Sequence, residues 1–439
     1  MACRPAPTCS LGATSGFVAN KLAGARLHTL PGGRTVVPLL HPQQHGLPFL
    51  LTLELHSAAP AAAVAQPPPA LDRDLYALHY VLAGSGQLVR ASGGAEQLQA
   101  GDSVLMHSGA AACRAGSAGG STDGPNLLEG SPWQLAALVA YMPRQLFEQQ
   151  QQQQQQQQGK QQQAQAGQPL EEQAWARMLH SARLQPLLQA PSSGNRADGG
   201  SSSSSSSSSS DAAAARQLPE EFVGALLAGA RETARQLLLQ DQQQQSGSES
   251  TNRSSSRLAD SGSNSSSSSP GLPLPAAVQA AASSVAGWWA EQQQRTCPVT
   301  KRTLSELTAF RLPNQTNRLA VQFDPFSRPQ VPFISGIEVF ERGHRTTPHV
   351  HPHAHELFFI LAGEGVGFCG DHRFPVTAGD VVVFRPGAVH GIDNGDASRM
   401  YCLELMVPNE AFAEFVRAGE DTGSLSGDDL CVLAAIGCR

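Results

Sequence analysis

The stretch that decides the fold is residues 343–394, which read GHRTTPHVHPHAHELFFILAGEGVGFCGDHRFPVTAGDVVVFRPGAVHGIDN. It places three histidines and one glutamate around two glycine turns: His349, His351, Glu356 and His390. A divalent transition metal is held by three or four nitrogen and oxygen donors that converge on one point. Because these four residues come from three separate places along the chain, only a folded scaffold could gather them. The stretch therefore predicts one metal site with open positions for a substrate.

The spacing ahead of Glu356 predicts short strands. His349 and His351 are two residues apart, so on a strand their side chains would share one face. Apart from Glu356 itself, residues 356–361 are apolar on both alternating faces, as expected for a strand that is covered on both sides. We expect three residues to form apolar walls beside the site: Phe358, Ile360 and Val383.

The second half of the stretch predicts another strand and a turn. Gly363 and Gly365 predict a tight turn after the first strand. A second strand is expected over residues 381–384, and Pro386-Gly387 should end it. His390 then follows this turn, where a third strand could supply the last donor.

An internal repeat divides the chain into two copies of one domain. Three segments of the first copy match three of the second in the same order: 48–55 with 332–339, 80–86 with 359–365, and 100–105 with 378–383. Each copy consists of short apolar runs bounded by Gly, Pro, Asp and Asn, without a long stretch of helical period. This pattern is typical of an all-β sandwich or barrel.

Low-complexity sequence separates the two copies. It contains a glutamine tract at 149–158, a serine tract at 201–210 and a mixed Gln/Ser segment at 242–269. Such segments bury too little apolar surface to offset their chain entropy, so we expect them to be disordered. Residues 219–238 predict a helix with acidic residues in its first turn, and 170–188 and 276–291 predict weaker ones.

These features divide the chain into five segments. They are a disordered N-terminus or short transit peptide (1–21), an N-terminal barrel without metal ligands (22–148), a Gln/Ser-rich insert with helical islands (149–295), a C-terminal barrel with the metal site (296–418) and a C-terminal tail (419–439).

Composition limits the partners and the compartment. The formal net charge of −6 comes without a large basic patch, which argues against nucleic-acid binding. No apolar run reaches transmembrane length, so we expect a soluble protein with no membrane partner. Eight scattered cysteines without a CxxC pair indicate reduced thiols. We expect a cytoplasmic protein, or a plastid one if the N-terminus, which has no acidic residue before Glu54, is a transit peptide.

The motifs around the predicted ligands resemble the two motifs of the cupin superfamily, which are small β-barrels on a jelly-roll plan. The resemblance covers residues 343–394 and extends through the repeat to residues 26–143, so the whole chain resembles a bicupin. Arg385 stands where the second motif usually has proline. By this resemblance, the metal ligands are His349, His351, Glu356 and His390.

The resemblance implies one divalent transition metal (Fe, Mn, Zn, Ni or Cu) and a small organic substrate. The implied activities are those of dioxygenases, decarboxylases, isomerases and lyases. The alternative is a non-enzymatic small-molecule-binding, sensor or storage-like bicupin, because a fold alone does not fix function. The two barrels of one chain could pair with each other, and whether the protein also forms a homodimer is left open.

The first copy lacks the donor set. Alignment of the repeat puts four residues that cannot complete a metal site at the ligand positions: Ala70, Asp72, Ala77 and Ala112. His79 matches Phe358, and we interpret it as a buried histidine because one imidazole makes a poor metal site. Glu54 and Glu338 occupy matching places, which suggests a shared structural role.

Several polar residues near the motif have more than one interpretation. The histidines of the segment could form a solvated loop that binds metal opportunistically, and we assign His353 and His355 to such a loop. Glu404 could point into the barrel and orient a histidine, or it could face solvent. Asn394 is expected to shape the turn after His390.

Overall fold

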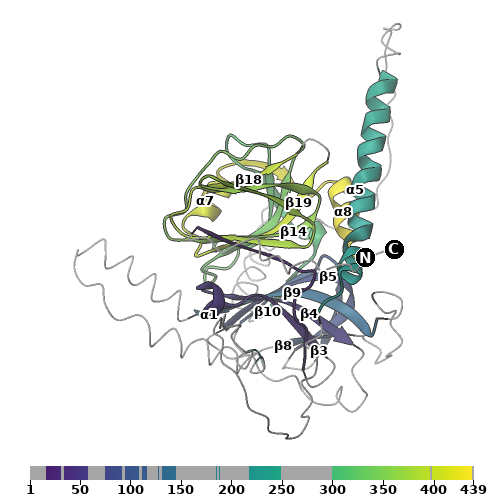
Figure 1. The fold of residues 1–439 in the computed structure, drawn as a ribbon, viewed down its shortest axis with the longest axis vertical. Helices are drawn as coiled ribbons and strands as arrows, with labels where there is room; N and C mark the ends of the chain where they lie inside the picture. Colours follow the sequence, from purple (N-terminus) through teal and green to yellow (C-terminus); the bar gives the residue numbers. More distant parts are fainter. Residues whose placement is uncertain are drawn as a thin grey trace, which may run out of the picture.

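A computed structural model of the chain shows two β-barrels packed side by side, with a long helix along one side of the pair (Figure 1). The described residues are 16–30, 34–57, 75–90, 94–107, 111–115, 127, 131–144, 184, 187, 217–248, 299–395 and 398–437. The glutamine and serine tracts at 149–158 and 201–210, and most of the predicted helices at 170–188 and 276–291, lie outside this part of the chain.

The C-terminal barrel is a jelly roll made of an eight-stranded sheet and a three-stranded sheet. The larger sheet has the order β1-β17-β14-β19-β13-β12-β11-β20, and the smaller has the order β16-β15-β18. Apart from β1 (Phe17–Lys21), the strands of this barrel are β11 (Thr308–Arg311), β12 (Arg318–Phe323), β13 (Ile334–Phe340), β14 (His355–Ala362), β15 (Glu364–Cys369), β16 (His372–Thr377), β17 (Asp380–Phe384), β18 (His390–Asn394), β19 (Met400–Val407) and β20 (Glu420–Gly423).

The N-terminal barrel repeats this plan. Its sheet has the order β10-β7-β5-β9-β4-β3-β2, with β6 and β8 also paired to β5. Its strands are β2 (His28–Leu30), β3 (Arg34–Leu40), β4 (Leu50–Ser57), β5 (Leu75–Arg90), β6 (Ala95–Gln99), β7 (Ser103–His107), β8 (Ala111–Ala115) and β9 (Trp133–Pro143), with the short helix α1 (Pro42–His45) between β3 and β4. The matching strand orders confirm that the sequence repeat encodes two copies of one all-β domain.

Each barrel receives one strand from the other half of the chain. Strand β1 (Phe17–Lys21) pairs with β17 of the C-terminal barrel, and Phe17 lies opposite Phe384. Strand β10 (Val299–Arg302) pairs with β7 of the N-terminal barrel. The predicted segment boundaries are therefore wrong at two places. Residues 17–21 are a strand rather than disordered chain, and residues 299–302 belong to the first barrel rather than the second.

The two barrels share one apolar core. Successive residues of β14 point to opposite faces. Leu357, Phe359 and Leu361 lie in the core that joins the barrels, whereas Phe358 and Ile360 lie in a separate cluster inside the C-terminal barrel. This arrangement confirms that the strand is covered on both sides. Val383 lies in the shared core, so its predicted place in the wall of the site is wrong.

Gly363 forms a corner rather than the predicted hairpin turn. Strand β14 pairs with β17 and β19, whereas β15 pairs with β16 and β18, so the chain passes from one sheet to the other at this residue. Gly363 has φ +88°, and a Cβ there would lie 2.8 Å from the carbonyl oxygen of Arg399. Glycine is required because both the backbone conformation and the close approach exclude a side chain.

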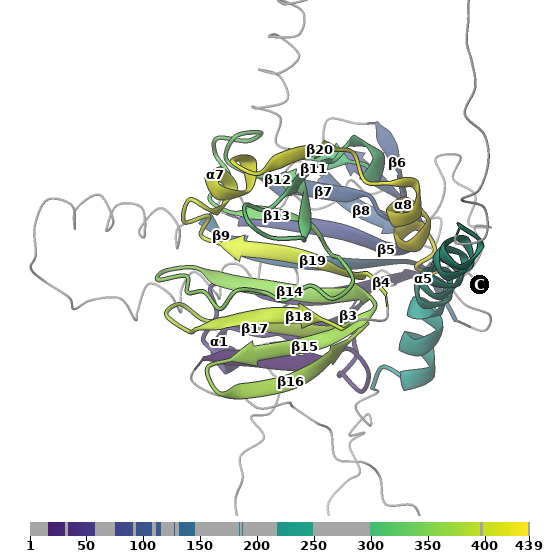
Figure 2. The ribbon, with the colours of Figure 1, turned by 90° about the horizontal axis from the view of Figure 1, so that it is seen from above.

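The predicted helix at 219–238 is confirmed as α5 (Glu220–Ser248), which runs on into the segment expected to be disordered from residue 242. Its buried face, with Leu226 and Leu227, joins the shared core and meets α8 (Gly427–Ala434) beside it (Figures 1 and 2). The predicted tail at 419–439 is likewise part of the fold, because β20 pairs with β11 and α8 packs on α5. The remaining described elements are α7 (Phe412–Arg417) and a 3-10 helix (Leu304–Glu306). No helix in the described ranges has both the length and the apolarity to span a membrane.

Candidate metal centre

Backbone hydrogen bonds bring the three chain segments of the predicted site together. His349 and His390 exchange two backbone hydrogen bonds as an isolated bridge, His349 N to His390 O at 3.3 Å and His390 N to His349 O at 3.0 Å. The N–H of Gly387 donates to the carbonyl oxygen of His351 at 2.9 Å. The segment with His349 and His351 therefore lies against the start of β18, although outside this bridge it is not the strand that the spacing predicted.

The four predicted donors meet at one point. One ligand atom from each of His349, His351, Glu356 and His390 lies within 4.8 Å of all the others. The Nε2 atoms of the three histidines lie 3.8, 3.7 and 2.7 Å from a carboxylate oxygen of Glu356, in that order. Glu356 and His390 are deeply buried, whereas the side chain of His349 is 36% exposed and lies at the rim of the site.

Two of the imidazoles are held with Nε2 toward the centre. His349 Nδ1 lies 3.0 Å from the carbonyl oxygen of Thr347, and His390 Nδ1 lies 2.8 Å from that of Ala388. A carbonyl can only accept, so each Nδ1 donates to it and each Nε2 is the atom that faces the centre. His390 Nε2 makes a hydrogen bond of 2.7 Å with Glu356 Oε2, and a bound metal would replace this hydrogen bond. The ring of His390 also stacks on Phe384 with 4.4 Å between centroids, which fixes its plane.

The electrostatics of the centre keep Glu356 ionised. Burial by itself would raise the pKa of Glu356, but the facing imidazoles of His349, His351 and His390 hold it well below the usual value. Burial lowers the pKa of His349, and the neighbouring carboxylate of Glu356 outweighs that effect and raises it. A carboxylate among three imidazoles is the charge pattern that a divalent cation would stabilise further.

The donor set fits one transition-metal ion. Donors that each lie about 2.1 Å from an ion are at most about 4.2 Å apart, so the observed limit of 4.8 Å requires only small rotations. His351 Nε2 is buried and has no hydrogen-bond partner among the described residues, which is costly for a polar atom unless a ligand fills the place. Three imidazole nitrogens and one carboxylate suit Mn, Fe, Co, Ni, Cu or Zn rather than Mg or Ca.

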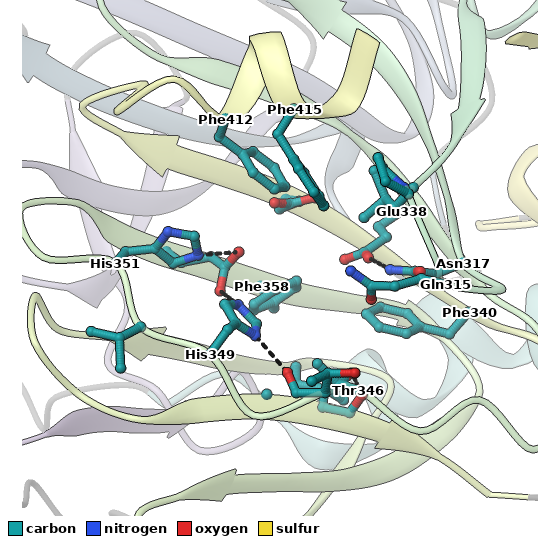
Figure 3. A pocket seen from close by; sticks show the side chains of 18 of the residues that line it. Gln315, Asn317, Glu338, Phe340, Thr346, His349, His351, Phe358, Phe412 and Phe415 are labelled. Atoms are coloured by element: carbon teal, nitrogen blue, oxygen red, sulfur yellow. Dashed lines mark hydrogen bonds and ion pairs between the residues drawn. The ribbon is translucent and has the colours of Figure 1, made fainter. Parts of the chain in front are cut away.

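A cavity of about 440 Å³ opens beside the donors. Its apolar walls include Phe340, Phe358, Phe412 and Ile392. Phe412 comes from α7 and lies 5.9 Å from the ring of His351, so the C-terminal part of the chain closes one side of the site (Figure 3). Gln315, Asn317 and Glu338 line the side of the cavity opposite His349 and His351 (Figure 3), and Glu404 lies against both Glu338 and Glu356. We call these four residues the far wall.

Glu338 and Glu404 form a buried carboxyl pair in this wall. Glu404 is only 2% exposed, so it points into the barrel and the alternative of a solvent-facing residue is wrong. Burial and the charge of Glu356 raise the pKa of Glu338 to about 8. Burial and the charges of Glu338 and Glu356 raise the pKa of Glu404 well above its usual value. The pair therefore holds at least one proton near neutral pH.

The matching carboxylate of the N-terminal barrel has the opposite environment. Glu54 Oε1 accepts hydrogen bonds from Arg34 and from the hydroxyl of Tyr141, each at 2.5 Å. Burial opposes ionisation of Glu54, but Arg34 and His56 hold its pKa far below the usual range. The prediction that Glu54 and Glu338 share one structural role is therefore wrong, because only Glu54 is ion-paired.

Other predictions for the first barrel hold in outline. His79 is buried, and burial lowers its pKa to about 4, so it is a neutral core histidine. Ala77 pairs with Tyr141 as Glu356 pairs with Met406, which confirms the alignment at this position. The position of His390 is less well predicted. In the second barrel His390 pairs with Cys369, and in the first barrel Arg90, which matches Cys369, pairs with Ala111. The residue equivalent to His390 is therefore Ala111 and not the predicted Ala112.

The remaining histidines and Asn394 have structural surroundings. His353 is an exposed loop residue whose backbone N–H donates to Glu410, as predicted for a loop. His355 is wrongly assigned to the loop, because it begins β14 and packs against Phe49 of the first barrel with 6.5 Å between centroids. Asn394 donates from Nδ2 to three backbone carbonyls (Phe340, Glu341 and Ser398), which confirms that it shapes the turn.

The sequence did not predict the far wall of the cavity. Gln315 and Asn317 lie before β12, in a segment that the motif does not include. The alternation of Cys402, Glu404 and Met406 against Leu403 and Leu405 along β19 was the available signal for an inward Glu404.

Comparison with known proteins identifies the domain. Residues 336–406 match the family model for the cupin domain. No curated protein matches the chain.

Solved structures with similar folds span most of both chains at low identity. They include the protein Ylba from E. coli (9% identity, 91% of this chain and 94% of that one, TM-score 0.41). Another is the oxalate decarboxylase of Lactobacillus farciminis in a formate complex (12% identity, 91% of this chain and 88% of that one, TM-score 0.39). A third is procruciferin, the 11S globulin of Brassica napus (12% identity, 89% of this chain and 85% of that one, TM-score 0.41). The family match covers the strands that carry Glu356, His390 and Glu404, and the barrel ahead of it has the same strand order. Residues 336–406 are therefore a cupin domain.

Proposed function

We propose that the C-terminal barrel binds one divalent transition-metal ion through His349, His351, Glu356 and His390 and acts as an enzyme on a small organic substrate in the adjoining cavity. The observation that carries this proposal is the convergence of all four donors beside a cavity of about 440 Å³. Cavities of this size are typical of sites for small molecules.

The residues of the chain divide the work. A bound metal would supply a Lewis acid and a place for substrate oxygen or nitrogen atoms. Glu356 offsets the charge of the cation, and the hydrogen bonds of His349 and His390 to backbone carbonyls keep both rings aimed at it. Phe358 and Phe412 exclude water from the reacting groups, which strengthens the electrostatic interactions there.

The carboxyl pair supplies a proton site. Glu338 and Glu404 line the same cavity and have raised pKa values, so one of them can give a proton to the substrate or take one from it near neutral pH. This role fits the proposed reaction classes (dioxygenase, decarboxylase, isomerase or lyase), and it supports an enzyme over a storage-like protein, which needs neither a metal site nor a buried acid.

Metal analysis followed by activity assays tests the proposal. Protein purified without added chelator should contain about one transition-metal ion per chain, and a panel of small amines, amides, phenols and organic acids should be screened for turnover and for dioxygen uptake. Turnover that disappears in His390→Ala supports the enzyme. Stoichiometric metal together with tight binding and no turnover across the panel would favour the alternative of a small-molecule sensor.

A further inference from the structure

The cavity contains buried polar atoms whose hydrogen-bonding capacity is unused. Among the described residues that line it, four such atoms have no partner other than a neighbouring carboxyl or imidazole: His351 Nε2, Asn317 Oδ1 and both carboxyl oxygens of Glu404. His351 belongs to the metal centre. Asn317 Oδ1 is an acceptor, and the Glu338–Glu404 carboxyl pair, which holds at least one proton, still has more acceptor sites than donors.

Buried acceptors are stabilised by donors, so the wall is complementary to N–H or O–H groups. Glu404 is 2% exposed and Asn317 is 2% exposed, so bulk water does not solvate them freely. Asn317 Nδ2 already donates to Glu338, which fixes the amide with its oxygen unpaired. The unmet need in this wall is therefore for donors.

The charge of the wall excludes an anionic group. Two carboxyl groups, Glu338 and Glu404, lie side by side, and none of the described residues that line the cavity is a lysine or an arginine. A substrate carboxylate placed here would meet two carboxyl groups without a cation to pair with. A neutral or positively charged group would not carry this penalty.

The N-terminal barrel shows which group satisfies such a carboxyl. Arg34 lies two residues before Val36, the strand partner of Glu54, and Asn317 lies two residues before Leu319, the strand partner of Glu338. In the first barrel the guanidinium of Arg34 donates to Glu54. In the second barrel the shorter Asn317 occupies the equivalent position and donates to Glu338. It does not bring a cation to the carboxyl pair, so a bound ligand can supply the donor group there.

From these observations, and resting on the proposed function, we propose that the wall formed by Asn317, Glu338 and Glu404 recognises an N–H group of the substrate. The substrate is then a nitrogen compound (an amine, amide or guanidine) whose other end reaches the metal centre, and a dicarboxylate is excluded. This assigns a specificity role to the far wall.

The test uses full-length protein loaded with Zn²⁺ and three short hydroxamic acids that share one metal-binding end. The other end is an amine, a carboxamide or a carboxylate, and calorimetry gives the three dissociation constants. The amine and the carboxamide should bind at least about tenfold more tightly than the carboxylate, because a wall of unpaired acceptors discriminates by hydrogen bonding. Equal or tighter binding of the carboxylate would overturn the inference.

Two variants separate recognition from folding. Glu404→Gln keeps the shape of the side chain, so Zn²⁺ should still bind while the advantage of the amine falls at least about tenfold. Asn317→Arg should reproduce the pair seen in the first barrel and reverse the order, so that the carboxylate binds best. A folding defect cannot produce such a reversal. Glu341→Gln, which removes a carboxylate paired with Arg318 and Arg399 outside the cavity, is the matched control and should change nothing in the order.

The outcomes distinguish this inference from the proposed function. If the wild-type protein does not retain Zn²⁺, the proposed function fails and the inference falls with it. If Zn²⁺ is retained and the three ligands bind equally in the wild type and in Glu404→Gln, the far wall is occupied only by water. In that case the inference alone is overturned.

Discussion

His79 gives a prediction whose size follows directly from the structure. The imidazole is buried in the first barrel, its Nδ1 has no hydrogen-bond partner among the described residues, and burial lowers its pKa to about 4. In the unfolded chain the pKa is 6.5, so acidification protonates the unfolded state first. Folding stability attributable to His79 is therefore complete above about pH 7 and is lost as the pH falls toward about 4.

The magnitude can be worked out from the two pKa values. They differ by about 2.5, which limits the loss to about 3 kcal/mol. Near pH 5 the unfolded imidazole is almost fully protonated and the folded one is mostly neutral, so the free energy of unfolding should be about 2 kcal/mol lower than near pH 7. Glu54, whose pKa is held low in the folded state, contributes a change only as the pH falls through about 4.5 and below.

Replacement by the residue at the matching position of the second barrel isolates this effect. His79→Phe, which copies Phe358, removes the titrating group, so the variant should lose about 2 kcal/mol less than the wild type between about pH 7 and about pH 5. Urea unfolding followed by tryptophan fluorescence measures both free energies, and the difference between proteins cancels the contributions of other histidines. Parallel pH dependences in the two proteins would refute the assignment of His79 as a neutral buried histidine.

Three further predictions concern the metal centre and the fold. His390→Ala should lose the bound metal while His353→Ala keeps it, as measured by elemental analysis, and the reverse result would reassign the ligands. Metal should dissociate as the pH falls below about 6.5, because the imidazoles must be deprotonated to bind it. The raised pKa of His349 moves the pH at which dissociation begins upward. Metal that is still bound near pH 4 would contradict a histidine site. Gly363→Ala should destabilise the protein by about 1–3 kcal/mol in urea unfolding, because φ is +88° and the new Cβ would lie 2.8 Å from a carbonyl oxygen. Gly370→Ala, with φ +55° and nothing within 4 Å, should cost less, and equal losses would show that the close contact does not matter.

Much of the candidate site could be predicted from sequence because the donor residues are chemically distinctive. His349, His351, Glu356 and His390 are metal-ligand residue types at metal-ligand spacing, and the structure brings all four within 4.8 Å. The detail of how they meet could not be predicted, because the segment carrying His349 is held by a single backbone bridge to His390 rather than by a regular strand.

The repeat predicted two barrels but could not show that they exchange strands. Strand β1 reaches β17 across more than three hundred residues, and a short apolar strand carries no local mark of its partner. The same limit applies to the corner at Gly363, where a glycine between two strands fits a hairpin and a change of sheet equally well.

The amino-acid sequence by itself determined the all-β fold class, the duplication, the helix beginning at Glu220 and the set of candidate metal donors. Each of these follows from local composition and periodicity, which record whether a side chain is buried and where a turn falls. Only the tertiary structure decided that Glu404 points inward and that Glu338 faces Asn317 where Glu54 faces Arg34. These outcomes depend on which strands become neighbours, and strand pairing is set by the packing of whole sheets rather than by any single stretch of chain.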